Sequence, residues 1–206
     1  MNKKNKKLVR AREKSVPIGY QKIVNALKSL LADRSFRDIT WREIAIKAGV
    51  SEALIYQYFR TRNNLLFTIL ADYLKVYRRI IWRRLDKATD ASNKIRILID
   101  GLLEVYDGDR VFARVIMLEV RNFPEYYDSE AYALTQEMGK KFVEVLEEGK
   151  RKGQIRKDIS SARMRQVLLG AVEHSILPYL IFRKKIDFKV LSRDLNALMI
   201  QGLQNR

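Results

Sequence analysis

Helix-breaking residues are scarce along this chain of 206 residues, which contains three prolines and nine glycines. β-Sandwiches and barrels need frequent turns, and those turns use glycine and proline at close intervals. Apolar residues recur here at helical spacings instead, beginning with Ile23, Ala26, Leu27, Leu30 and Leu31. The sequence therefore predicts an all-α protein.

The residue types present exclude several kinds of chemistry. The chain has no cysteine, which removes disulfides, thiolate catalysis and cysteine-ligated metals. Its single histidine, His174, permits a Ser-His-Asp triad only formally and does not permit a multi-histidine metal site. Sequence motifs of phosphate loops, zinc proteases and nucleophile elbows are absent. We expect no catalytic site, metal or cofactor.

Positive charge is concentrated at the N-terminal end. The chain carries 41 lysines and arginines against 24 acidic residues, a formal net charge of +17. Residues 1–62 hold 15 of the basic and five of the acidic residues. This asymmetry favours a polyanion-binding module in that part, although a lysine-rich leader that only aids solubility is the alternative. Residues 1–15 lack apolar periodicity and are expected to form a flexible basic arm.

No segment is predicted to enter a membrane. The basic N-terminus is not followed by an apolar stretch of signal-peptide length. The longest apolar runs, at residues 167–172 and 176–182, fall far short of the roughly 20 residues needed to span a bilayer. We expect a cytoplasmic protein without a membrane partner.

Two short helices joined by a tight turn are predicted between residues 40 and 59. Thr40 and Glu43 have the spacing of a capping box at the start of the first helix. Gly49 stands where a left-handed cap would end it, and Ser51 is a suitable N-cap for the second helix. This pattern predicts a helix-turn-helix.

The outward face of the second helix is suited to DNA. Tyrosine hydroxyls and guanidinium groups can bind phosphate oxygens, and Gln57 can read an adenine edge. Tyr56 and Tyr58 could alternatively brace the turn as half-buried aromatics, and Glu52 either accepts from a cytosine or turns away. The candidate DNA-binding residues are Thr40, Trp41, Arg42, Ser51, Glu52, Ala53, Tyr56, Gln57, Tyr58, Arg60 and Arg62.

The run from Thr40 to Leu66 resembles the DNA-binding segment of the tetracycline-repressor (TetR) family. The motif Ile-Ala-x-x-Ala-Gly-Val-Ser ends at Ser51, and Tyr-x-Tyr-Phe ends at Phe59. A basic residue and the pair Leu65-Leu66 follow at the family's spacing, within a likeness that covers residues 18–70. Asn63 and Asn64 depart from the acidic pair usual in the family.

The remaining chain is predicted to form six further helices, over residues 61–87, 92–106, 109–121, 129–151, 160–182 and 187–204. After the basic arm over residues 1–15, the resemblance implies a three-helix DNA-binding domain over 16–62 and a helical ligand-binding and dimerisation domain over 63–206. It also implies a homodimer through the last two helices, about 160–204. Their apolar stripes could alternatively close only the core of one chain.

The resemblance further implies a pocket for a small-molecule effector. The candidate lining residues are Tyr77, Trp82, Phe112, Met117, Arg121, Phe142, His174 and Tyr179. The aromatic side chains suit an apolar or aromatic ligand, while Arg121 or His174 could meet a carboxylate or phosphate. Each candidate could also be ordinary core, and His174 a hydrogen-bonded core histidine. Residues 123–127 bear a likeness to regulators of fatty-acid metabolism in this family.

These observations favour a ligand-responsive transcriptional regulator, a repressor that binds a palindromic double-stranded DNA operator as a dimer. The effector, an apolar, acyl or aromatic small molecule, would release it. The alternative is an architectural DNA-binding protein without an effector.

Overall fold

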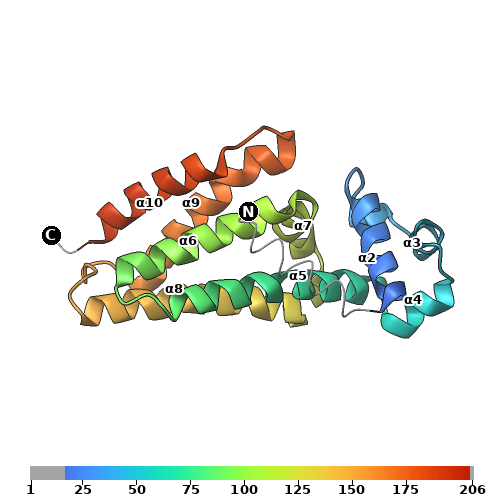
Figure 1. The fold of residues 1–206 in the computed structure, drawn as a ribbon, viewed down its shortest axis with the longest axis horizontal. Helices are drawn as coiled ribbons and strands as arrows, with labels where there is room; N and C mark the ends of the chain where they lie inside the picture. The colour runs from blue at the N-terminus through green and yellow to red at the C-terminus, as the bar shows by residue number, and fades with distance from the viewer. Residues whose placement is uncertain (1–16, 205–206) are drawn as a thin grey trace. The chain divides into compact units, whose positions relative to one another are not determined.

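The computed structural model describes residues 17–204, whose regular structure is helical (Figure 1). The α-helices are α2 (Ile18–Leu31), α3 (Trp41–Ala48), α4 (Glu52–Tyr58), α5 (Arg62–Leu85), α6 (Ala91–Gly108), α7 (Arg110–Arg114), α8 (Glu130–Arg151), α9 (Ser161–Phe182) and α10 (Phe188–Leu203). An isolated bridge joins Ile155 and Gln204. The all-α prediction is confirmed, whereas the predicted basic arm lies outside the described residues.

The chain divides into two compact units. Among the described residues, the first unit extends up to Val76 and includes Val111–Ala133, and the second contains Tyr77–Arg110 and the residues from Leu134 to Gln204. The boundaries between the units therefore fall within helices α5, α7 and α8. The sequence-based domain boundaries at residues 15 and 62 stay predictions.

The first unit is built on a small helical core beneath α3 and α4. Ile23 and Leu27 of α2, Ile44 of α3 and Ile55 of α4 are fully buried. Phe59 follows α4 and is only 1% exposed. Because helices this short are marginal on their own, their burial against α2 is what fixes α3 and α4 in place.

The second unit consists of longer helices with apolar stripes. Its helices α6, α9 and α10 lie side by side (Figure 1). The buried stripe of α9 comprises Ser161, Met164, Leu168, Val172, Ile176 and Leu180. The side chains of Asp90, Ser160 and Asp187 cap the starts of α6, α9 and α10, which satisfies backbone N–H groups that have no partner within the helix.

The prediction of one helix over residues 109–121 is wrong. Helix α7 ends at Arg114 and continues as a π turn, Val115–Glu119, in which the Val120 N–H donates to the Val115 carbonyl five residues earlier. Two 3₁₀ turns follow, Val120–Asn122 and Pro124–Asp128. Apolar periodicity could not distinguish these forms, because three consecutive residues of the π turn, from Val115, are buried.

Candidate nucleic-acid interface

Helix α3 begins with the predicted capping box. The Glu43 N–H donates to the Thr40 hydroxyl over 3.3 Å, and the Thr40 N–H donates to the Glu43 carboxylate over 2.8 Å. The Arg34 guanidinium lies 2.6 Å from the same carboxylate. Arg34, followed by the Thr40 donors, lowers the pKa of Glu43 to about 2. The start of α3 is thus held by a permanently ionised carboxylate at neutral pH.

The turn between α3 and α4 also has the predicted form. Gly49 adopts the left-handed conformation with φ 63°, which a side chain would make unfavourable. The Ser51 hydroxyl then accepts the Leu54 N–H over 3.2 Å at the start of α4. The helix-turn-helix is therefore defined by two local caps on either side of one glycine.

Helix α4 presents a polar and aromatic face to solvent. Its Ile55 is fully buried and Leu54 half-buried, whereas the residues predicted to point outward are exposed: Glu52, Ala53, Tyr56, Gln57 and Tyr58. Ser51 and Thr40, although both are caps, are exposed as well. The exposed residues from Ser51 to Tyr58 lie on one short helix and its N-cap, and an α-helix is of a size that fits the major groove of DNA.

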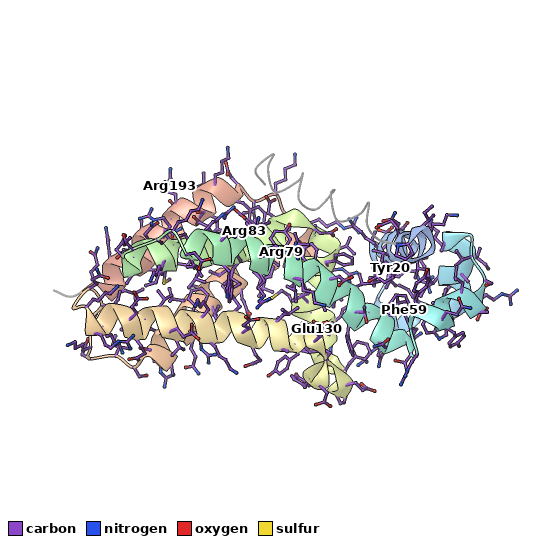
Figure 2. All side chains as sticks on the ribbon, turned by 60° about the horizontal axis from the view of Figure 1, so that its bottom comes forward. Tyr20, Phe59, Arg79, Arg83, Glu130 and Arg193 are labelled. Atoms are coloured by element: carbon purple, nitrogen blue, oxygen red, sulfur yellow. The ribbon has the colours of Figure 1, made fainter. Side chains whose placement is uncertain are left out.

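The two tyrosines of α4 are held by aromatic neighbours. The Tyr56 ring lies 5.1 Å from the half-buried Trp41 ring, and Tyr56 remains 51% exposed. Tyr58 packs edge-on against Tyr20 of α2 at 5.8 Å. Tyr20 also lies beside Phe59 (Figure 2) and donates its hydroxyl to Asp72 over 2.8 Å. Both tyrosines thus pack against aromatic neighbours but are exposed and not half-buried, so their rings still reach the surface.

The candidate arginines differ in their surroundings. Arg42 and Arg60 are exposed. Arg62 instead donates to the Ile39 carbonyl over 2.5 Å and lies over the Phe36 ring at 5.3 Å. Such contacts occupy a guanidinium inside the protein, so the structure gives Arg62 a positioning role, and its contact with DNA stays a prediction.

Several residues that position this module are not predictable from the sequence. A Cβ at Gly19 would lie 3.1 Å from Leu54, so this glycine lets α2 approach α4 closely. Tyr20, Arg34, Arg114 and Glu119 were also missed. The only available signal was that Glu119 interrupts an apolar run, because the partners of these residues are remote in sequence.

The candidate effector residues are divided between the two units. Phe112, Met117 and Arg121 lie in the first unit. Tyr77, Trp82, Phe142, His174 and Tyr179 lie in the second.

Their burial differs too. Tyr77, Phe112, Met117 and Phe142 are buried, and Trp82 and Tyr179 are half-buried, with burial raising the pKa of Tyr179. Arg121 and His174 are exposed, so the interpretation of His174 as a core histidine is wrong for the single chain: it lies on the side of α9 opposite the buried stripe.

Two surface grooves contain none of these candidates. One, of about 610 Å³, lies between α6 and α10 and is lined by Arg96, Asp100 and eight residues from Lys189 to Gln204. The other, of about 500 Å³, is lined by residues of the 61–68 and 125–130 segments. Among residues 17–204 there is no cluster of histidine and acidic side chains arranged to hold a metal ion, and no helix long and apolar enough to cross a membrane.

Comparison with known proteins covers nearly the whole chain. Residues 23–69 match the family described as bacterial regulatory proteins, tetR family, and residues 70–202 match the family described as YsiA-like protein, C-terminal region. The fatty acid metabolism regulator protein of Bacillus subtilis (strain 168) is 22% identical over 191 residues, covering 91% of this chain and 96% of that protein.

Two solved structures share the fold. One is the transcriptional regulator FadR from Bacillus subtilis in complex with stearoyl-CoA, with a TM-score of 0.80 and 21% identity, covering 89% of this chain and 98% of that one. The other is the fatty acid degradation regulator FadR from Bacillus halodurans, with a TM-score of 0.79 and 23% identity, covering 91% and 97%.

Proposed function

The chain belongs to the tetR family of bacterial regulatory proteins, and from this premise we propose that it represses transcription as a dimer on a palindromic operator, from which a long-chain acyl-CoA releases it. The family consists of DNA-binding transcription regulators and is not a family of enzymes. The observation that carries the proposal is the exposed face of α4, in which Gln57 lies between two braced tyrosines. We assign residues 16–62 to DNA binding and residues 63–206 to effector binding and dimerisation.

In this proposal α4 enters the major groove. Gln57 contacts base edges, with Glu52 and Ala53 beside it at the N-terminal end of the helix. Tyr56, Tyr58, Arg42 and Arg60 contact phosphates on either side. The remaining candidates in this face, Thr40, Trp41, Ser51 and Arg62, hold the helix-turn-helix in shape or complete the backbone contacts.

The proposed effector follows from the relatives and from the apolar candidates. The Bacillus subtilis relative regulates fatty acid metabolism, and the FadR structure from that organism holds stearoyl-CoA. In the second unit of this chain, Tyr77 and Phe142 are buried and Trp82 is flanked by the cations of Arg78 and Lys141 at 5.7 and 5.9 Å. Apolar rings next to cations suit a ligand with an acyl chain and phosphate groups.

The proposed dimer uses the outward faces of α9 and α10. On α9, Val167 is 55% exposed and Gly170 has open space around its Cβ position. On α10, Leu198 is 68% exposed and Gly202 is equally open. Exposed apolar residues interspersed with glycine permit close helix packing between two copies.

Fluorescence anisotropy on a duplex from the region upstream of the protein's own gene tests the DNA-binding half of the proposal. At about 0.15 M salt, specific binding should exceed binding to a scrambled duplex by about 10³-fold or more, with two chains per duplex. If both duplexes bind equally, the comparison is repeated with operator candidates from a genome-wide binding map. Equal binding to those candidates and to scrambled duplexes would indicate an architectural DNA-binding protein instead.

The effector is tested with Trp82 as a reporter. The chain has two tryptophans, so the variant Trp41→Phe leaves only Trp82 to report on the second unit. Stearoyl-CoA should change the Trp82 emission and weaken operator binding by the wild-type protein by about 5–150-fold. Free coenzyme A is the control without the acyl chain, and no response to any acyl-CoA would contradict this effector.

A further inference from the structure

The connection between α2 and α3 has neither a left-handed cap after α2 nor a side-chain cap from Ser35. Helix α2 ends after Leu31 without a glycine or a left-handed residue. The following 3₁₀ turn, Phe36–Asp38, starts at Ser35, whose side chain makes no capping hydrogen bond. Helix ends leave backbone carbonyls and N–H groups that need partners. Within the connection Arg34 donates to the Asp38 carbonyl, but the Leu31 carbonyl and the Phe36 N–H take their partners from another segment. The connection leads directly into the capping box of α3.

Two side chains beyond residue 110, in the same unit, supply the missing partners. The Arg114 guanidinium donates to the Leu31 carbonyl and, over 3.1 Å, to the Arg34 carbonyl. The Glu119 carboxylate accepts the Phe36 N–H over 2.8 Å and the Ser35 hydroxyl over 3.2 Å. Arg114 thus caps the end of α2, and Glu119 caps the start of the 3₁₀ turn.

The caps also bind each other. Arg114 and Glu119 form an ion pair, and their side chains are 21% and 11% exposed. A charge-assisted pair with this little exposure fixes both side chains more firmly than a solvated surface pair would. The two ends of the connection are therefore both bound by one ion pair in the segment from Arg114 to Glu119.

The π turn makes this pairing possible. In an α-helix, residues five apart point in directions about 140° different around the axis and cannot pair. In a π turn the hydrogen bond runs between residues five apart, as it does from Val120 to Val115. The side chains of Arg114 and Glu119 therefore lie on the same side of the turn. Return to the α-helical register would turn one of the two side chains away.

We propose that the π turn Val115–Glu119 holds Arg114 and Glu119 as positioning residues for operator binding, and that conversion of this turn to an α-helical register would withdraw both caps from the α2–α3 connection. Arg34 carries the effect onward, because it also pairs with Glu43 in the capping box of α3. The inference rests on the proposed function for its consequence on DNA, but its structural part can be tested without DNA.

Operator binding gives the first test, with Glu119→Gln and Glu119→Ala as the variants. Both raise the net charge by one, which by itself strengthens non-specific DNA binding. The proposal expects the opposite for the operator: a loss of about tenfold for Glu119→Ala and a smaller loss for Glu119→Gln, which can still accept hydrogen bonds. Glu125→Gln, at an exposed position of the 3₁₀ turn Pro124–Asp128, makes the same charge change and should not weaken operator binding.

A double variant tests whether the two residues act together. Once Glu119→Ala has removed one cap, adding Arg114→Ala should cost less operator affinity than Arg114→Ala costs in the wild-type background. Fully additive losses would contradict a joint role. Unchanged operator affinity in Glu119→Ala, or an equal loss on operator and scrambled duplexes, would also overturn the proposal.

Hydrogen exchange without DNA separates this inference from the proposed function. In Glu119→Ala and Glu119→Gln, amide exchange should accelerate in the peptide over residues 33–40, while protection in α10 stays as in the wild type. Unchanged exchange over residues 33–40 would overturn the inference even if the protein binds its operator. Accelerated exchange in a protein that selects no operator would support the capping role and reject only the proposed function.

Discussion

The helix-turn-helix region and the α6, α9 and α10 region are both helical, yet they are specified in different ways. Helices α3 and α4 have eight and seven residues and owe their ends to side-chain caps and one left-handed glycine. Helix α9 also begins at a side-chain cap, Ser160, but its 22 residues carry a long stripe of buried side chains that holds it in place. Packing against α2 holds these short helices in place, whereas their caps define the residues at which they begin and end. Matched substitutions in the two regions can test this contrast.

The largest effects are expected from two buried phenylalanines. Phe59 is 1% exposed in the first unit, and Phe142 is fully buried in the second. Phe59→Ala and Phe142→Ala should each lower the free energy of unfolding by about 3–5 kcal/mol, because each removes a buried ring and leaves a cavity. Denaturant titration measures this. A loss below about 1 kcal/mol at either site would show that the site is less tightly packed than its burial indicates.

Leu198→Asp should affect DNA binding while leaving the single chain intact. Leu198 is 68% exposed, so a charge there disturbs the proposed dimer rather than the core. Loss of the second binding module should weaken operator binding by at least about a hundredfold. Sedimentation velocity should show monomers. The control Gln136→Asp adds the same charge on an exposed position of α8. Dimers that persist in Leu198→Asp would remove this face from the proposal.

Two left-handed glycines give an intermediate effect. Gly49 and Gly153 have φ 63° and 70°, and apart from their neighbours in the chain no residue has an atom within 4 Å of either Cβ position. Alanine should therefore cost about 1–2 kcal/mol at each site through backbone strain alone. Thermal unfolding should show similar losses for both variants, whereas anisotropy should show weaker operator binding only for Gly49→Ala. Equal operator affinity in the two variants would contradict the assignment of the turn to DNA binding.

The smallest effects concern two ionised carboxylates. Glu43 beside Arg34, and Glu148 beside Lys152 and Lys94, both have a pKa lowered to about 2 from the usual 4.5. A lowered pKa stabilises the folded state above pH 4.5, and this contribution is lost as the pH falls toward 2. The gap in unfolding free energy between wild type and Glu43→Gln, or Glu148→Gln, should accordingly be present at pH 6 and close at low pH. A gap that does not change with pH would rule out these ion pairs as its cause.

Much of the proposed DNA-binding face was predictable because its signals are local. Thr40 with Glu43, Gly49 and Ser51 act within one or two turns of chain, so their spacing alone reveals the caps. The exposed face of α4 followed from helical periodicity. The braces of that face could not be predicted, since Tyr20 meets Asp72, which lies 52 residues away.

The sequence by itself determined that the chain is helical, where most of its helices lie and which face of α4 points outward in the helix-turn-helix. These features depend on propensity, caps and periodicity, which act over a few residues. Only the tertiary structure decided that residues 115–119 form a π turn, and that Arg114 and Glu119 cap a connection some 80 residues earlier. Burial of a guanidinium and a carboxylate is favourable only where carbonyls and N–H groups are placed to form hydrogen bonds with them. Folding is what brings those partners into position.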